Sequence, residues 1–142
     1  MGTLDGEGIK RYIPHRQPFL FLDAILELNE TRIVAQKHFS ENEYFLRGYY
    51  PDDPQVPLIL LVEALAQASG IIASRFYRQN DKRLIVTGME KVRFSQKVVS
   101  GDTVVFEVKP VHIRGRVAKV RGIASVNGKT VVEAEITGAF VS

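Results

Sequence analysis

An isolated carboxylate within an apolar stretch is the feature of this sequence that most directly suggests chemistry. Residues 56–66 are apolar except for Glu63, and a carboxylate among apolar side chains is costly unless it has a partner or a function. A glutamate can accept or donate a proton in a reaction. Gln67 follows one helical turn later, so its amide can hydrogen-bond to Glu63. The alternative is that Glu63 is simply an acid near a helix N-terminus, stabilised by the helix dipole.

The loop before Glu63 and the helix that carries it are indicated by prolines and by apolar spacing. Residues 48–57 read GYYPDDPQVP, with Pro51, Pro54 and Pro57 three residues apart. Because proline is tolerated in the first turn of a helix, we expect the helix to begin at Pro57. Apolar residues keep helical spacing as far as Phe76, and the opposite face is apolar as well, which predicts a buried helix.

Most of the remaining sequence predicts strands. Residues 32–39 alternate in polarity, which is typical of an edge or half-exposed strand. Gly88 interrupts one strand and suggests a bulge, and Asn127-Gly128 is a strong hairpin signal. The expected strands cover residues 23–28, 32–39, 84–94, 103–113, 116–126 and 130–141.

Small residues on the last two expected strands leave room for the helix to lie against them. They are Ala118, Gly122, Ala124, Ala134 and Gly138. A parallel sheet of at least five strands would need several crossover helices, and only one long helix is available. The sequence therefore predicts a single α+β domain over residues 1–142, with an antiparallel sheet wrapped around one long central helix.

Composition narrows the class of protein. The chain has no cysteine, which excludes disulfides and thiolate chemistry. Its longest apolar run, residues 56–66, is too short to span a bilayer, and residues 1–13 lack the apolar segment of a signal peptide, so we expect a soluble cytoplasmic protein. The net charge is +3. Basic residues cluster in residues 91–97 and 114–121, a pattern that suits an acidic protein partner better than nucleic acid.

Four segments, taken together and in order, resemble a known family. They are PHRQPFLFLD (residues 14–23), NEYF-x-x-GYYP (42–51), VEALAQASG (62–70) and VRFSQKVVSGDT (92–103). They are similar to the beta-hydroxyacyl-acyl-carrier-protein dehydratases of fatty-acid synthesis, the FabZ-type branch of the hotdog fold, and the resemblance spans residues 9–141. It implies a dimer with one continuous sheet, often assembled into a hexamer. It also implies a 3-hydroxyacyl substrate on a carrier protein, bound in a tunnel at the dimer interface, and no metal or diffusible cofactor.

The resemblance also implies which residues form the site. In the family, a histidine in a Gly-His-Phe-Pro motif acts as acid and base, opposite a helix glutamate of the other protomer. Glu63 matches that glutamate, whereas Tyr49 falls at the histidine position. The family's glycine-arginine pair becomes Asp52-Asp53, and Leu58 replaces the glycine that follows the last proline. The residues expected to contact substrate are Gly48, Tyr50, Pro57, Leu58, Gln67 and Phe94.

These departures weigh against the family's reaction. An unperturbed tyrosine has a pKa of about 10 and is a poor base at neutral pH; losing a positioned acid or base costs about 10²–10⁴-fold in rate. Leu58 keeps its backbone N–H, which can stabilise an oxyanion, but its side chain occupies space that glycine leaves open. Asp52 and Asp53 add negative charge where an enolate would form. The sequence therefore predicts acyl-thioester binding with dehydration weak or lost.

Three functions remain open. The first is an acyl-thioester-binding protein of dehydratase descent, in which dehydration is weak or absent; one version of it is active in a mixed dimer, where the histidine of a paralogue would face this chain's Glu63. The second is a thioesterase that uses Glu63 on thioesters of acyl carrier protein or coenzyme A. The third is a non-catalytic acyl-binding or regulatory protein. His15 is expected to have a structural hydrogen-bonding role, and His38 and His112 are expected at the surface. No metal, nucleic acid or membrane partner is expected.

Overall fold

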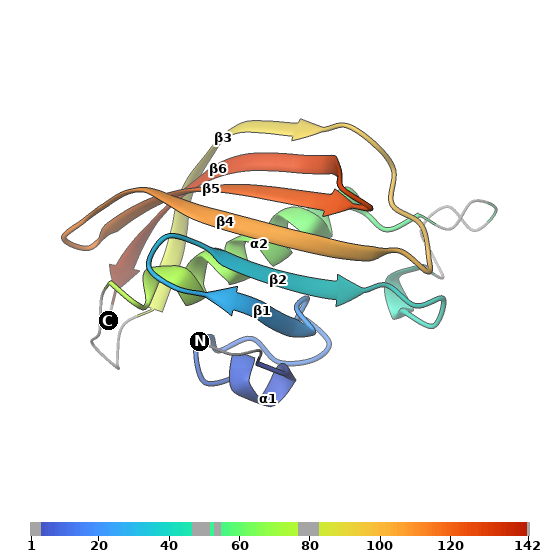
Figure 1. Cartoon of the computed structure of the whole chain (residues 1–142), viewed down its shortest axis with the longest axis horizontal. Helices are drawn as coiled ribbons and strands as arrows, with labels where there is room; N and C mark the ends of the chain where they lie inside the picture. The colour runs from blue at the N-terminus through green and yellow to red at the C-terminus, as the bar shows by residue number, and fades with distance from the viewer. Residues whose placement is uncertain (1–3, 47–51, 53–54, 77–82, 142) are drawn as a thin grey trace.

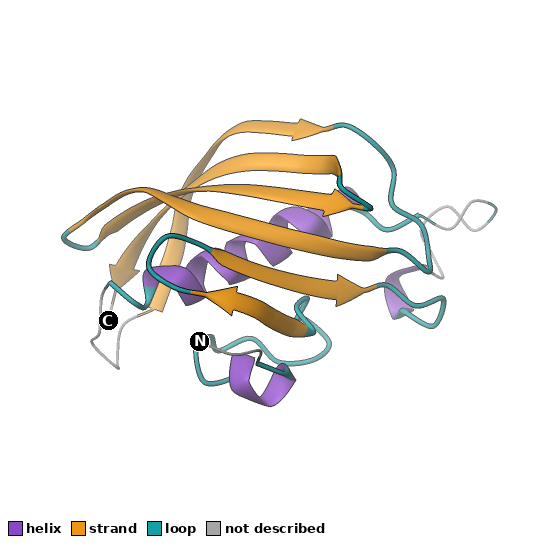
Figure 2. Ribbon diagram, in the orientation of Figure 1, coloured by secondary structure: helices purple, strands orange, loops and turns teal. Residues whose placement is uncertain are grey.

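The computed structural model describes residues 4–46, 52, 55–76 and 83–141. These residues form a curved antiparallel sheet with one long helix on its concave side (Figure 1; Figure 2). The α+β class is therefore confirmed. Gly48, Tyr49, Tyr50 and Asp53 lie outside the described residues.

The six strands of the described sheet follow the order β1-β2-β4-β5-β6-β3. Because β1 pairs with β2, the strand predicted over residues 32–39 is not an edge strand; its half-exposed alternation is confirmed. The elements are α1 (Gly6–Ile9), β1 (Ala24–Leu28), β2 (Ile33–His38), the 3-10 helix η1 (Tyr44–Leu46), α2 (Leu58–Ala73), β3 (Arg83–Phe94), β4 (Thr103–Arg114), β5 (Val117–Val126) and β6 (Lys129–Val141).

The central helix α2 begins where proline predicted. Pro57 is the N-cap residue, and no side chain caps the helix there. The helix ends earlier than the apolar spacing suggested: it stops at Ala73, and Phe76 lies beyond it, 43% exposed. The amides of Arg75 and Phe76 bond to carbonyls three residues back, so the chain leaves the helix through a tighter turn. Most of the helix from Leu61 to Ala73 is buried, as expected, while Glu63, Ala66 and Gly70 are half-buried.

The sheet and the helix pack closely at Gly122. A methyl group at this position would lie 3.0 Å from the Leu65 Cδ2 atom, so α2 uses the space that glycine leaves. The expectation that Gly138 leaves room for the helix is wrong. A methyl group there would meet Leu84 Cδ1 at 2.9 Å and the Ile85 carbonyl at 3.0 Å. Glycine at 138 therefore accommodates the neighbouring strand β3 rather than the helix.

Local backbone signals match the predicted turns. Asn127 and Gly128 have φ angles of 50° and 80°, the left-handed values that a tight two-residue hairpin requires. The pairing of β3 with β6 shifts register between Val86 and Gly88, which confirms the bulge. A second shift lies between Glu90 and Arg93.

Lys37 lies on the inner face of β2 and is 6% exposed. Its Nζ atom lies 3.5 Å from Asp23 Oδ1 and 3.3 Å from Glu43 Oε1. A buried lysine needs such partners, because an unpaired charge is costly to desolvate. Since Glu43 immediately precedes η1, this cluster anchors the start of the loop that leads towards α2.

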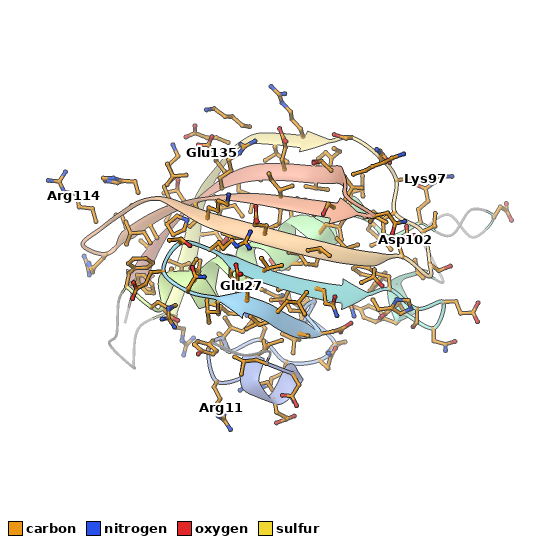
Figure 3. All side chains as sticks on the ribbon, in the orientation of Figure 1. Arg11, Glu27, Lys97, Asp102, Arg114 and Glu135 are labelled. Atoms are coloured by element: carbon orange, nitrogen blue, oxygen red, sulfur yellow. The ribbon has the colours of Figure 1, made fainter. Side chains whose placement is uncertain are left out.

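The basic clusters are paired largely within the chain, across the outer face of the sheet. Lys91 Nζ lies 3.1 Å from Glu135 Oε2 and Lys119 Nζ lies 3.4 Å from Glu135 Oε1; Arg121 Nη2 lies 3.5 Å from Glu133 Oε2. Figure 3 shows Glu135 beside β3 and β6, and Arg114 projecting from the β4–β5 turn. These pairs weaken the expectation of an acidic partner at this surface. The hydrogen bond from Lys91 lowers the pKa of Glu135.

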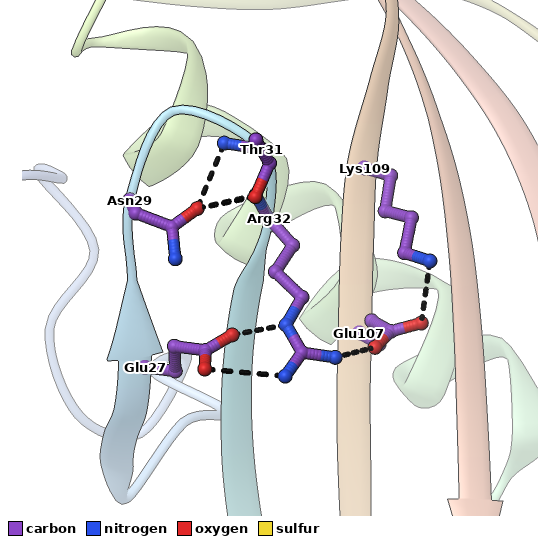
Figure 4. Close-up of polar contacts among 6 residues, drawn as sticks. All are labelled: Glu27, Asn29, Thr31, Arg32, Glu107 and Lys109. Carbon is purple, nitrogen blue, oxygen red and sulfur yellow. Dashed lines mark hydrogen bonds and ion pairs between the residues drawn. The ribbon is translucent and has the colours of Figure 1, made fainter.

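A second ion-pair network joins the first strands (Figure 4). Arg32 binds Glu27 through two nitrogens and reaches Glu107 Oε2 with Nη1 at 2.8 Å. The bond to Arg32 lowers the pKa of Glu27. The network ties β1, β2 and β4 together across the outer face. Within the described residues, no helix is both long and apolar enough to cross a membrane.

Candidate active site

Glu63 lies in the second turn of α2, and its side chain is 29% exposed. The carboxylate is therefore accessible, although most of the helix is buried. Gln67 Nε2 donates a hydrogen bond to Glu63 Oε1 at 3.0 Å. This bond, predicted from their spacing of one helical turn, is confirmed.

Gln67 connects the helix to the segment before β1. It is 1% exposed, and its Oε1 accepts a hydrogen bond from the Phe21 amide at 2.9 Å. Its Nε2 also donates to the Phe19 carbonyl at 2.9 Å. Both amide hydrogens and the oxygen are thus used. A fully satisfied buried polar group of this kind is rigid, so Glu63 Oε1 is held in a defined place.

His15 is the site neighbour that sequence reasoning missed. Its Nε2 lies 3.3 Å from Glu63 Oε1, and its side chain is 31% exposed. Its ring stacks on Phe19, with ring centroids 6.4 Å apart and planes 15° apart. The sequence suggested only a structural role in a turn. The contact joins residues 48 positions apart (63 − 15), and no local pattern predicts it.

The N-terminus of α2 presents its first amides without a side-chain cap. The first amides of a helix have no intrahelical acceptor, and the helix dipole favours negative charge there. The position suits a developing oxyanion. Leu58, whose side chain was expected to crowd this space, is partly buried and packs against the main core.

The remaining predicted site residues are placed as follows. Pro57 is half-buried at the N-cap of α2. Phe94 is 50% exposed at the end of β3. Asp52 is exposed. Gly48, Tyr49 and Tyr50 lie outside the described residues, so their expected roles remain predictions. The structure therefore brings together Glu63, Gln67 and His15.

The other two histidines are at the surface, as expected. His38 is exposed on β2, with Nδ1 3.0 Å from Thr103 Oγ1, and His112 is exposed on β4. In the part of the chain that the structure describes, no three His, Asp or Glu side chains are placed to hold a metal ion.

Known proteins share both the sequence and the fold of this chain. Residues 13–135 match the model of the FabA-like domain family. The 3-hydroxyacyl-[acyl-carrier-protein] dehydratase FabZ of Streptococcus agalactiae is 40% identical over 137 residues, covering 96% of this chain and 98% of that protein. The FabZ of Halalkalibacterium halodurans is 42% identical over 135 residues, covering 94% and 96%.

Solved structures share the fold at much lower sequence identity. The dehydratase heterocomplex ApeI:P from Xenorhabdus doucetiae has a TM-score of 0.81 and 18% identity, covering 94% of this chain and 91% of that one. A hypothetical thioesterase with coenzyme A from Streptococcus pneumoniae has a TM-score of 0.67 and 13% identity, covering 83% and 84%. The fold is the hotdog fold. On the family match and the near full-length identity, this chain belongs to the FabA-like family and is of the FabZ type.

Proposed function

We propose that this chain binds 3-hydroxyacyl thioesters of acyl carrier protein in cytoplasmic fatty-acid or related acyl metabolism, and that it dehydrates them slowly when it acts alone. The observation that carries the proposal is the accessible carboxylate of Glu63, held by Gln67 one turn from the uncapped end of α2. Relatives about 40% identical to this chain are named as dehydratases of such substrates.

Dehydration needs a proton removed from C2 and a hydroxide lost from C3. In its protonated form, Glu63 is suited to give its proton to the C3 hydroxyl, which then leaves as water, because its side chain is anchored yet accessible. The first amides of α2 are suited to stabilise the enolate oxygen. Tyr49 supplies a hydroxyl at the position where the family has an imidazole, and a phenol is a poor base for C2 at neutral pH. Slow turnover follows from that single replacement.

The exposed edge of β3 supports assembly with a second hotdog chain. This 12-residue strand carries apolar side chains that are about half exposed: Ile85 (50%), Met89 (41%) and Phe94 (50%). A long apolar edge favours pairing with another strand. The partner in this proposal is a second copy, as a dimer or a trimer of dimers, or a histidine-bearing paralogue whose imidazole would face this chain's Glu63. One solved structure with this fold is itself a dehydratase heterocomplex.

The test is hydration of crotonyl thioesters, the reverse reaction, by the natural protein and by Tyr49→His. We expect Tyr49→His to be faster by about 10² or more, because it restores a base whose pKa lies near neutral pH. Tyr49→Phe serves as the control for a change at this position without an imidazole. The proposal fails if Tyr49→His has no activity on either the carrier-protein or the coenzyme A thioester.

Thioester hydrolysis is the second candidate, favoured by the contacts that Glu63 receives within its own chain. An anchored carboxylate can activate water without a partner's histidine. Release of thiol from acyl thioesters, lost in Glu63→Gln, would support hydrolysis. Saturable acyl-thioester binding with neither hydration nor thiol release would instead support a binding or regulatory role.

A further inference from the structure

The two oxygens of the Glu63 carboxylate have different surroundings. Oε1 is contacted by both Gln67 Nε2, at 3.0 Å, and His15 Nε2, at 3.3 Å. Among the described residues, no donor lies on Oε2. Gln67 hydrogen-bonds to Oε1, and His15 Nε2 lies within 3.3 Å of the same oxygen, so both neighbours lie on the Oε1 side and leave the other oxygen for a ligand.

The backbone and the ring of His15 are both held in place. Arg16 Nη1 donates to the carbonyls of Ile13 and His15, at 2.9 and 2.8 Å. Phe19 stacks against the imidazole, and the carbonyl of Phe19 accepts from Gln67. The two groups that contact Glu63 are thus parts of one packed unit, formed by residues 13–21 and α2.

The surroundings of the two ring nitrogens of His15 favour one tautomer of the neutral imidazole. Its Nε2 faces a carboxylate, so the proton of the neutral ring belongs on Nε2, where it can be donated. Its Nδ1 is buried, with no hydrogen-bond partner in the described part of the chain. A buried nitrogen without an acceptor is better left unprotonated, because an N–H there would be unsatisfied. The His15 ring therefore presents its Nε2 towards Glu63, 3.3 Å from Oε1, while Nδ1 faces the buried side.

We propose that His15 is a positioning residue for Glu63: by donating to Oε1, it directs Oε2 towards the reacting thioester. This inference rests on the proposed function. It gives the site an imidazole from the same chain as Glu63, distinct from the imidazole that the family has where this chain has Tyr49. A carboxylate that loses one of its two anchors can rotate away, and misplacement by about 1 Å can cost about 10²-fold in rate.

The test compares His15→Ala, His15→Asn and His15→Gln in the Tyr49→His background. The glutamine side chain places its Nε2 as many bonds from the backbone as histidine Nε2, so it can still donate to Glu63. The asparagine nitrogen corresponds to Nδ1 and stops short. His38→Ala is the control for losing a surface imidazole. Thermal unfolding of each variant shows whether it is folded, and kcat and KM for crotonyl-thioester hydration are then measured.

We expect His15→Ala and His15→Asn to lower kcat by about 10²-fold, with KM changed by less than about threefold, and His15→Gln to recover most of the loss. In the natural protein, Glu63→Gln should shift the ring-nitrogen NMR signals of His15, which checks the contact without turnover. Three results would each overturn this inference and leave the proposed function standing. They are an unchanged kcat in folded His15→Ala, equal losses of kcat in His15→Gln and His15→Asn, and ring-nitrogen signals of His15 that do not shift in Glu63→Gln. Absence of turnover in Tyr49→His itself would overturn the proposed function and this inference with it.

Discussion

The contacts of Glu63 with Gln67 and His15 show how a half-buried carboxylate is accommodated on a largely apolar helix. Gln67 uses all its hydrogen-bonding groups, on Glu63, Phe19 and Phe21. The link between Glu63 and Gln67 could be predicted, because residues four apart on a helix are neighbours. The contact with His15 could not, because it depends on how the segment before β1 packs on α2.

At the residue scale, Gln67→Leu should destabilise the protein by about 2–4 kcal/mol, because the Phe21 amide and the Phe19 carbonyl lose their partner in a buried site. Urea unfolding measures the change. Gln36→Leu is the matched control, since Gln36 is half-exposed on β2 and should cost less than about 0.5 kcal/mol. Equal effects of the two substitutions would show that the Gln67 bonds add no stability.

At the scale of elements, the fold depends on strands wrapping one helix. Alternation and turn residues predicted the strand boundaries closely; for example, β6 runs from Lys129 to Val141, against an expected 130–141. The order of the strands in the sheet was not predictable. The alternation of apolar residues and the turn residues show where strands lie in the sequence, but they do not show which strands pair with each other. The position of β2 inside the sheet and the neighbour of Gly138 were misjudged for this reason.

The close packing of Leu65 on Gly122 gives a second prediction. Gly122→Ala should cost about 1–3 kcal/mol, because its methyl group would lie 3.0 Å from Leu65 Cδ2. Combining it with Leu65→Val, which shortens the opposing side chain, should cost less than the sum of the two single changes. Gly6→Ala is the control, since nothing lies within 4 Å of a methyl group there. Strict additivity in the double-mutant cycle would contradict the contact.

The ion pairs across the outer face predict how stability depends on pH. Lys91 and Lys119 lower the pKa of Glu135, and Arg32 lowers that of Glu27, from an ordinary value of 4.5. A carboxyl whose pKa is lower in the folded state contributes stability above its unfolded value, and that contribution is lost as pH falls through the folded value. The free energy of unfolding should therefore fall between about pH 5 and about pH 3.

Glu135→Gln should make this fall in stability smaller, while Glu41→Gln, a change at an exposed position outside the sheet, should leave it unchanged. Denaturant unfolding at several pH values provides the measurement. Identical pH slopes in Glu135→Gln and the natural protein would mean that the Glu135 cluster contributes nothing to acid stability.

At the scale of the whole molecule, β3 is the edge most available to a second chain. Its apolar side chains are exposed at one end of the sheet order, beside β6. The helix α2, by contrast, is covered by the sheet of its own chain. Sequence alone indicated a dimer only through family resemblance, because exposure at an edge becomes visible only when the order of the strands is known.

Charges on this edge should block assembly. If the chain forms the proposed dimer through β3, Ile85→Lys combined with Met89→Lys should convert it to a monomer, because lysine on an edge strand opposes pairing. Sedimentation velocity reports the oligomeric state. Val111→Lys is the control: Val111 is 55% exposed but lies on β4, inside the sheet order. A dimer that survives the double substitution would place the interface elsewhere.

The central claim is that the Glu63 half of the site is intact and that Tyr49 replaces the missing base. The most direct measurement is the rate of crotonyl-thioester hydration by Tyr49→His with and without Glu63→Gln. We expect Tyr49→His to exceed the natural protein by about 10²-fold or more, and the added Glu63→Gln to remove that gain, because both groups are needed for acid and base catalysis. A Tyr49→His protein that is no faster than the natural one, or a gain that survives Glu63→Gln, would contradict the account.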